Sequence, residues 1–189
     1  MNFSLEDLNK DTLRSYRRMF DARNPNNLFS GLEDVSFFHS IGALWLENGK
    51  YLATNAAILL FGNYLQIKQI YPEFNLDYRE NASHSSRWNY RLDASDLSWS
   101  GNIFDFLSMV LSHVKPFLPN LFHLAEDGVA EDGGKLLMEA VREGVVNAIC
   151  NCYFFASWRS AHSLRRRPNC LLECRASSSS IKANAYEWR

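Results

Sequence analysis

The chain has 189 residues, of which 47% are hydrophobic and 14% aromatic, and its formal net charge at pH 7 is −1. This length allows one domain, or one domain with a small partner, and is enough to bury a hydrophobic core. The many aromatic residues argue against a disordered chain, and no apolar run reaches the roughly 18 residues of a membrane-spanning helix.

The first third of the chain has the patterns of three helices and one β-hairpin. Asp11 is the predicted N-cap of the first helix, because its carboxylate can accept a free backbone N–H. Asn48-Gly49 predicts the type I′ turn of the hairpin, and Thr54 is the predicted N-cap of a wholly apolar third helix. The expected elements are a helix over 11–23, a helix over 33–41, strands 43–46 and 51–53, and a helix over 56–61.

The middle of the chain mixes strand and helix patterns. Strands are expected on either side of Pro72, and an amphipathic helix is expected to end at Pro116. The expected elements are strands 67–70 and 74–78, an irregular polar segment 81–91, a helix over 102–114, an acidic loop 125–134 and a helix over 135–150. The whole pattern predicts an α+β fold: a helical N-terminal segment with a β-hairpin, and then a mixed middle region.

Four stretches of the sequence carry a resemblance to a known family. They are TNAAILLFG at 54–62, FNLDYRE at 74–80, WSGNIFDF at 99–106 and REGVVNAI at 142–149. Together they resemble bacterial ATP-binding proteins described as transcriptional regulators and related to the C-terminal region of the RecG helicase. The resemblance covers about residues 5–149. It implies a Schlafen/AlbA-type DNA-binding domain before this region and a divergent GHKL-like ATPase domain that starts with the last motif.

The resemblance also implies a nucleotide site on the last predicted helix. Glu143 and Asn147 are four residues apart and so share one face of that helix. In GHKL-type ATPases the Glu orients or deprotonates the attacking water, so Glu143 is the candidate catalytic base. The Asn amide oxygen helps to hold Mg²⁺ between the phosphates, so Asn147 is the candidate metal and cofactor ligand for ATP. From spacing alone, a solvated helix face would be the favoured interpretation of the two residues.

The last forty residues depart from the family. Residues 1–151 carry 13 basic and 19 acidic side chains, a net charge of −6, whereas residues 152–189 carry 7 and 2, a net charge of +5. No glycine follows Gly144, so the loops that cradle adenine and phosphates in a GHKL site are missing. The segment 152–189 has neither strand nor helix periodicity, and we expect it to be disordered or translated out of frame. A zinc site formed by Cys150-x-Cys152 and Cys170-x₃-Cys174 is the weaker alternative.

These observations divide the chain into a RecG-C-terminal-like region (1–124), the first helix of a truncated GHKL-like domain (125–151) and a tail (152–189). The expected function is that of a fragment of an ATP-binding transcriptional regulator with impaired nucleotide binding; whether it is an enzyme is left open. A non-catalytic interaction or linker module is the alternative. Because residues 1–10 lack a secretory signal, we expect a cytoplasmic protein without membrane contacts. DNA contacts are expected only through the family's preceding domain, and protein partners or oligomers remain open.

Overall fold

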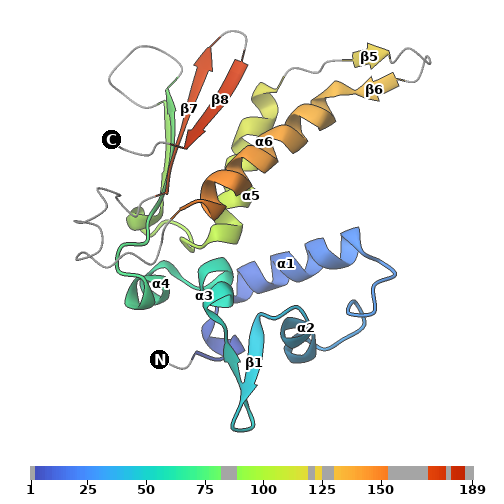
Figure 1. Ribbon diagram of the computed structural model, residues 1–189, viewed down its shortest axis with the longest axis vertical. Coiled ribbons are helices and arrows are strands. Elements are labelled where there is room, and N and C mark those ends of the chain that lie inside the picture. The colour runs from blue at the N-terminus through green and yellow to red at the C-terminus, as the bar shows by residue number, and fades with distance from the viewer. Residues whose placement is uncertain are drawn as a thin grey trace. The chain divides into compact units, whose positions relative to one another are not determined.

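A computed structural model describes residues 3–81, 89–118, 122–124, 130–152, 170–177 and 180–185 (Figure 1). The chain has an α+β fold, as predicted, and forms two compact units. Unit 1 comprises residues 1–72 and 94–105, and unit 2 comprises residues 73–93 and 106–189. The boundary expected at residue 124 therefore falls inside unit 2. In the part of the chain that the structure describes, no helix is both long and apolar enough to cross a membrane.

Unit 1 contains short helices around an aromatic core. Its elements are η1 (Leu5–Asp7), α1 (Lys10–Arg23), α2 (Asp34–Ser40), β1 (Leu44–Glu47), β2 (Lys50–Ala53), α3 (Asn55–Phe61), α4 (Tyr64–Ile70) and η2 (Ala94–Asp96). Phe37, Phe38 and Phe61 are at most 1% exposed. The ring of Tyr16 from α1 lies 5.0 Å from the ring of Phe61 in an edge-on contact. Edge-on aromatic contacts of this kind stabilise the packing of α1 against α2 and α3.

Local signals in unit 1 act largely as predicted. Asn48 and Gly49 both have positive φ, 48° and 77°, as a type I′ hairpin turn requires. The Thr54 side chain accepts the backbone N–H of Ala57 at 3.2 Å and so caps α3. The expected cap of α1 at Asp11 is wrong: the Asn9 side chain accepts the backbone N–H groups of Asp11 and Thr12, the second and third residues of the helix. Asn9 comes first in the chain and is an equally good N-cap residue.

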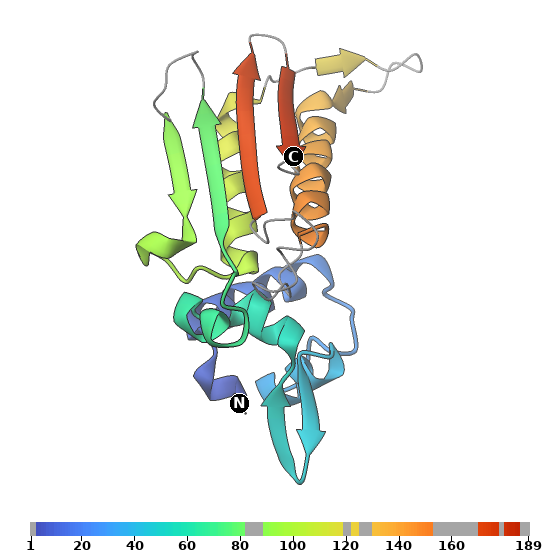
Figure 2. The ribbon, with the colours of Figure 1, turned by 60° about the vertical axis from the view of Figure 1, so that its left-hand side comes forward.

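Unit 2 is built on a four-stranded sheet in the order β4-β3-β7-β8. Its elements are β3 (Leu76–Asn81), β4 (Tyr90–Asp93), α5 (Ile103–Val114, which begins in unit 1), η3 (Lys115–Phe117), β5 (Phe122–Leu124), β6 (Ala130–Asp132), α6 (Gly133–Cys150), β7 (Cys170–Ser177) and β8 (Ser180–Ala185). β3 and β7 are parallel, and the other neighbours are antiparallel. Figures 1 and 2 show α5 and α6 on the same face of the sheet.

The strand expected over 67–70 is wrong, because these residues belong to α4. The Asn63 backbone N–H donates to the Gln66 side chain at 2.9 Å and forms half of a capping box that starts a helix at Tyr64. Ile67 and Ile70 are three residues apart, which is a helical spacing and not the alternation of a strand.

The segments expected to be irregular, 81–91 and 125–134, are shorter than predicted, because β4 begins at Tyr90 and β6 occupies 130–132. Residues 82–88 and 125–129 lie outside the described residues.

The tail is also more regular than expected. Within 152–189, residues 170–177 and 180–185 form β7 and β8, which corrects the expectation of a segment without folded elements. β7 pairs with β3 over Leu76–Asn81 and Cys170–Arg175. Without β7, the edge of β3 would present unpaired backbone N–H and C=O groups. A segment that lacks strand periodicity in its side chains can still pair with them through its backbone. Residues 153–169 lie outside the described residues.

Candidate functional site

Three of the four family-like motifs use most of their polar side chains to build the fold, beginning with 99–106. Asn102 is fully buried in unit 1. Its Nδ2 donates to the hydroxyl of Thr12 and to the carbonyl of Gly62, both at 3.1 Å. Its Oδ1 accepts the backbone N–H of Asp105 at 2.9 Å. A single amide therefore joins α1, the end of α3 and the start of α5.

Asp105 extends the same network. Its Oδ2 accepts the hydroxyl of Thr12 at 2.6 Å and that of Ser100 at 2.5 Å. Between Ser100 and Asn102 the chain passes through Gly101, whose φ is +75°. A Cβ at this position would lie 2.6 Å from the Cβ of Tyr64, so only glycine fits. The motif at 54–62 also serves the fold. Thr54 caps α3, and the backbone carbonyl of Gly62 accepts a hydrogen bond from the Asn102 amide.

The motif at 74–80 forms a charged cluster on the β3–β4 hairpin in unit 2. Asp77 has only 7% of its side chain exposed. It accepts Arg79 Nε at 2.8 Å and the Nε and Nη2 of Arg91 at 2.9 and 2.8 Å. Two guanidinium groups thus neutralise one buried carboxylate, which is the pairing that a buried charge requires.

The opposite face of the same hairpin carries a second pair. Glu80 lies 2.6 Å from Nε2 of His113 on α5. The imidazole stacks on the ring of Tyr90, with centroids 3.7 Å apart and an interplanar angle of 11°. These contacts attach α5 to the sheet, so the charged side chains of this motif also stabilise the fold.

The fourth motif, 142–149, differs from the other three. On α6, Val145, Ala148 and Ile149 are buried, with exposed fractions of 2, 6 and 6%. Glu143 and Asn147 lie on the same helix, one turn apart, as the spacing predicted, and both are exposed. Among the described residues, no side chain forms a hydrogen bond or ion pair with either of theirs. The structure therefore brings the two candidate site residues together on a face that the fold does not use.

The described part of the chain contains no group of three or more His, Cys, Asp or Glu residues that could hold a metal ion. Cys150 is exposed and Cys152 half-buried, and both are free thiols. The Cys152 thiol lies 3.1 Å from the carbonyl of Ala148. The side chains of the Cys170 and Cys174 pair lie outside the described residues, so the zinc alternative is not tested.

A basic stripe on α1 was not predicted from the sequence. Lys10, Arg14 and Arg18 are four residues apart, are all exposed and line the same pocket. The signal for them was present, because residues at i, i+4 and i+8 lie along one face of a helix. The balance of acidic over basic residues in the body of the chain conceals this local positive charge.

Comparison with known proteins gives the fold a counterpart. Residues 1–77 match a family described as a domain of unknown function (DUF8451). No curated protein matches the chain. The chain is similar to the crystal structure of the DIP2311 protein from Corynebacterium diphtheriae, with 16% sequence identity and a TM-score of 0.56. The match covers 93% of this chain but only 29% of that one, and at this identity it concerns the fold alone.

Proposed function

We propose that this chain is part of an ATP-linked regulator and that the exposed face of α6 meets a Mg²⁺-bound nucleotide. One observation carries the proposal. In three of the four motifs that resemble ATP-binding regulators, most polar side chains bond within the fold; Asn55 is also exposed, but only the α6 motif presents an exposed Glu and Asn one helical turn apart on the same helix. Exposed polar residues without a structural task are candidates for binding or catalysis.

The residue types fit a magnesium nucleotide. Mg²⁺ prefers oxygen ligands and keeps several waters and phosphate oxygens, so a single protein amide can complete its shell. When bound, the ion neutralises charge on the phosphates. The Asn147 side chain would supply the amide oxygen. The Glu143 carboxylate, one helical turn away, would orient a water and accept its proton.

Binding by this chain is expected to be weak, because no glycine follows Gly144 to form a phosphate-binding loop. We expect a dissociation constant of about 1 mM or more, which corresponds to a binding free energy of roughly −4 kcal/mol at best.

An NMR titration of the ¹⁵N-labelled chain with millimolar MgATP tests the proposal. We expect amide shifts in the part of α6 around Glu143 and Asn147, and we expect Asn147→Ala to abolish them. Asn55→Ala is the matched control, since it removes an equally exposed helical asparagine in unit 1. If MgATP shifts no α6 amide, or shifts them equally in both variants, this function is wrong for the chain.

A second candidate function, a protein-interaction module, rests on the β1–β2 hairpin. Trp45, Leu46 and Tyr51 are 53, 52 and 38% exposed. Large apolar side chains gathered on one exposed element are typical of contact surfaces. Sedimentation velocity tests self-association: Trp45→Ser should reduce it, whereas Leu28→Ser, at a 90% exposed leucine outside the hairpin, should not. Equal sedimentation of both variants and the parent chain would exclude self-association through the hairpin.

A further inference from the structure

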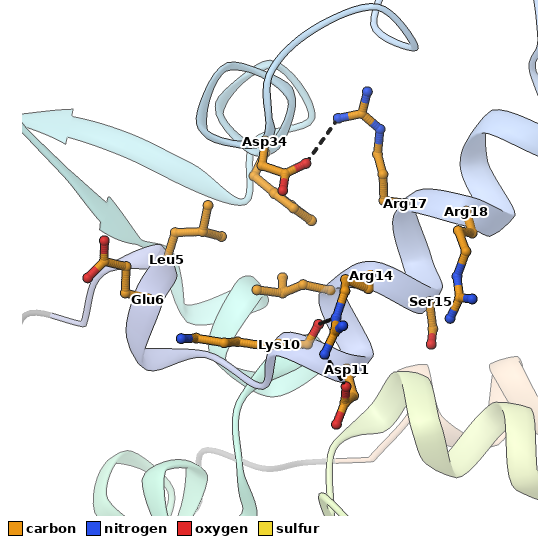
Figure 3. Close-up of a pocket in the computed structure, with 11 residues that line it drawn as sticks. Leu5, Glu6, Lys10, Asp11, Arg14, Ser15, Arg17, Arg18 and Asp34 are labelled. Carbon is orange, nitrogen blue, oxygen red and sulfur yellow. Dashed lines mark hydrogen bonds and ion pairs between the residues drawn. The ribbon is translucent and has the colours of Figure 1, made fainter.

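An open pocket of about 790 Å³ lies in unit 1 between η1, α1 and the start of α2 (Figure 3). Four cationic side chains of α1 line it, and three of them, Lys10, Arg14 and Arg18, follow one face of the helix. They are one helical turn apart, so their Cα atoms span about 12 Å along the helix at 1.5 Å per residue. The volume lies within the range of small-ligand and peptide pockets.

Much of this positive charge is available to a ligand. Arg14 is paired with Asp11 at 2.6 Å, but both side chains are more than two-thirds exposed, at 71 and 88%. An ion pair so open to water contributes little, so an incoming anion can replace Asp11 at small cost. Among the described residues, no acidic side chain pairs with Lys10 or Arg18.

Arg17, the fourth cation of the pocket, has a different role. Its Nη2 donates to the backbone carbonyls of Ser30 and Leu32 at 2.6 and 2.8 Å. Its Nη1 reaches Asp34 at 3.3 Å, as the dashed line in Figure 3 shows. These bonds hold the loop before α2 in place, so Arg17 shapes the pocket and is not a ligand-binding group.

The remaining wall of the pocket is apolar. Leu5, Leu13 and Phe38 line it. A ligand that fills the pocket therefore contacts both positive charge and hydrocarbon. Phe38 is only 1% exposed, so its ring offers no face on which a nucleic-acid base could stack. Glu6 and Asp34 also line the pocket and repel any anion near them, so the site favours a ligand with a few spaced negative charges over a phosphate backbone that is charged at every unit.

We propose that this pocket binds an acidic peptide segment of a partner protein, with carboxylates on Lys10, Arg14 and Arg18 and an apolar side chain against Leu5. A peptide helix with acidic residues four apart matches the spacing of the three cations. Carboxylate–guanidinium hydrogen bonds fix the register of the peptide, and burial of the apolar side chain adds affinity. The inference is independent of the nucleotide proposal, which concerns α6.

Fluorescence anisotropy with the full chain tests this site. The probe is a fluorescein-labelled helical peptide of glutamate, leucine and alanine, with glutamates four residues apart. Two control peptides replace its glutamates by glutamine or its leucines by serine, and labelled oligothymidylate is the nucleic-acid probe. The variants are Arg14→Ala and the double variant Lys10→Ala/Arg18→Ala. Arg23→Ala, which removes an exposed arginine at the end of α1 outside the pocket, is the matched control.

We expect the acidic peptide to bind, Arg14→Ala to weaken binding by about tenfold, the effect of losing one charge-assisted hydrogen bond, and the double variant, which loses two, to weaken it by about a hundredfold. Arg23→Ala should leave the affinity unchanged, both control peptides should bind more weakly, and added salt should reduce binding. Circular dichroism confirms that the variants are folded. No binding of the acidic peptide, equal binding by the pocket variants and Arg23→Ala, or tighter binding of oligothymidylate at the same residues would overturn the proposal.

Discussion

Replacing Asn102 by alanine should destabilise unit 1 more than any exposed substitution in the chain. The Asn102 side chain is fully buried and makes three hydrogen bonds. Without it, the carbonyl of Gly62 and the N–H of Asp105 lose a partner in a site with no access to water. The hydroxyl of Thr12 is less affected, because it still donates to Asp105 at 2.6 Å.

The expected loss follows from these groups. Each buried polar group left without a partner costs about 1–3 kcal/mol, so two such groups give a loss of about 3 kcal/mol for Asn102→Ala. For a unit of about 84 residues, that corresponds to a fall of roughly 12–24 °C in the melting temperature of the transition that reports unit 1. Asn102→Asp should be at least as damaging, because it keeps the acceptor but places a carboxylate beside Asp105.

Thermal and urea unfolding followed by circular dichroism measure this loss. Asn55→Ala is again the control, because its exposed side chain forms no hydrogen bond to the described residues, and we expect a change below about 0.5 kcal/mol. If Asn102→Ala costs no more than Asn55→Ala, the buried amide does not hold the three helices together, and the structural assignment of the 99–106 motif is wrong.

The remaining predictions concern other positions. Gly101→Ala should lower the melting temperature, because of its positive φ and the Tyr64 side chain, whereas Gly31→Ala, with open space around it, should not. The backbone N–H and then the hydroxyl of Ser4 lower the pKa of Asp7, so the melting temperature gained over Asp7→Asn should be present above pH 4 and be lost as the pH falls through the lowered pKa. Glu143→Gln should retain the MgATP-induced amide shifts in NMR spectra, because this residue is the proposed base and not the metal ligand.

The gene sequence gives a separate test of the tail. If residues after 151 are translated out of frame, the overlapping frame should encode a continuation of the family, with a glycine in register with Trp158. An uninterrupted frame without such an overlap would show that β7 and β8 belong to the native protein. The pairing of β7 with β3 is compatible with either origin, because backbone ladders require little of side chains.

Elements with a strong local signal could be predicted from the sequence. The turn at Asn48 and Gly49 has few conformational alternatives, and the Thr54 cap is a single side chain acting three residues away. The errors come from competition between equal local signals, as with Asn9 and Asp11, and from short apolar runs, as at 67–70. β7 could not be predicted, since its partner strand lies about ninety residues earlier and parallel pairing leaves little trace in local sequence.

The candidate site was predictable to a similar degree. The spacing of Glu143 and Asn147 predicts their common helix face, whereas the exposure of both side chains is known only from the structure. The buried role of Asn102 could not be derived, because a polar residue in a short motif is equally typical of a binding site. Only the structure distinguishes the two roles, because Asn102 is buried among helices whereas Asn147 is exposed to solvent.

Paramagnetic line broadening with Mn²⁺-ATP tests the central claim most directly. Mn²⁺ accepts the same oxygen ligands as Mg²⁺, and it broadens the amide signals nearest to the bound ion. We predict that broadening is strongest in α6 around Asn147, that Asn147→Ala removes it and that Asn55→Ala does not. Broadening centred elsewhere in the described chain, or the same broadening in both variants, would contradict the assignment of α6 as the nucleotide-binding face.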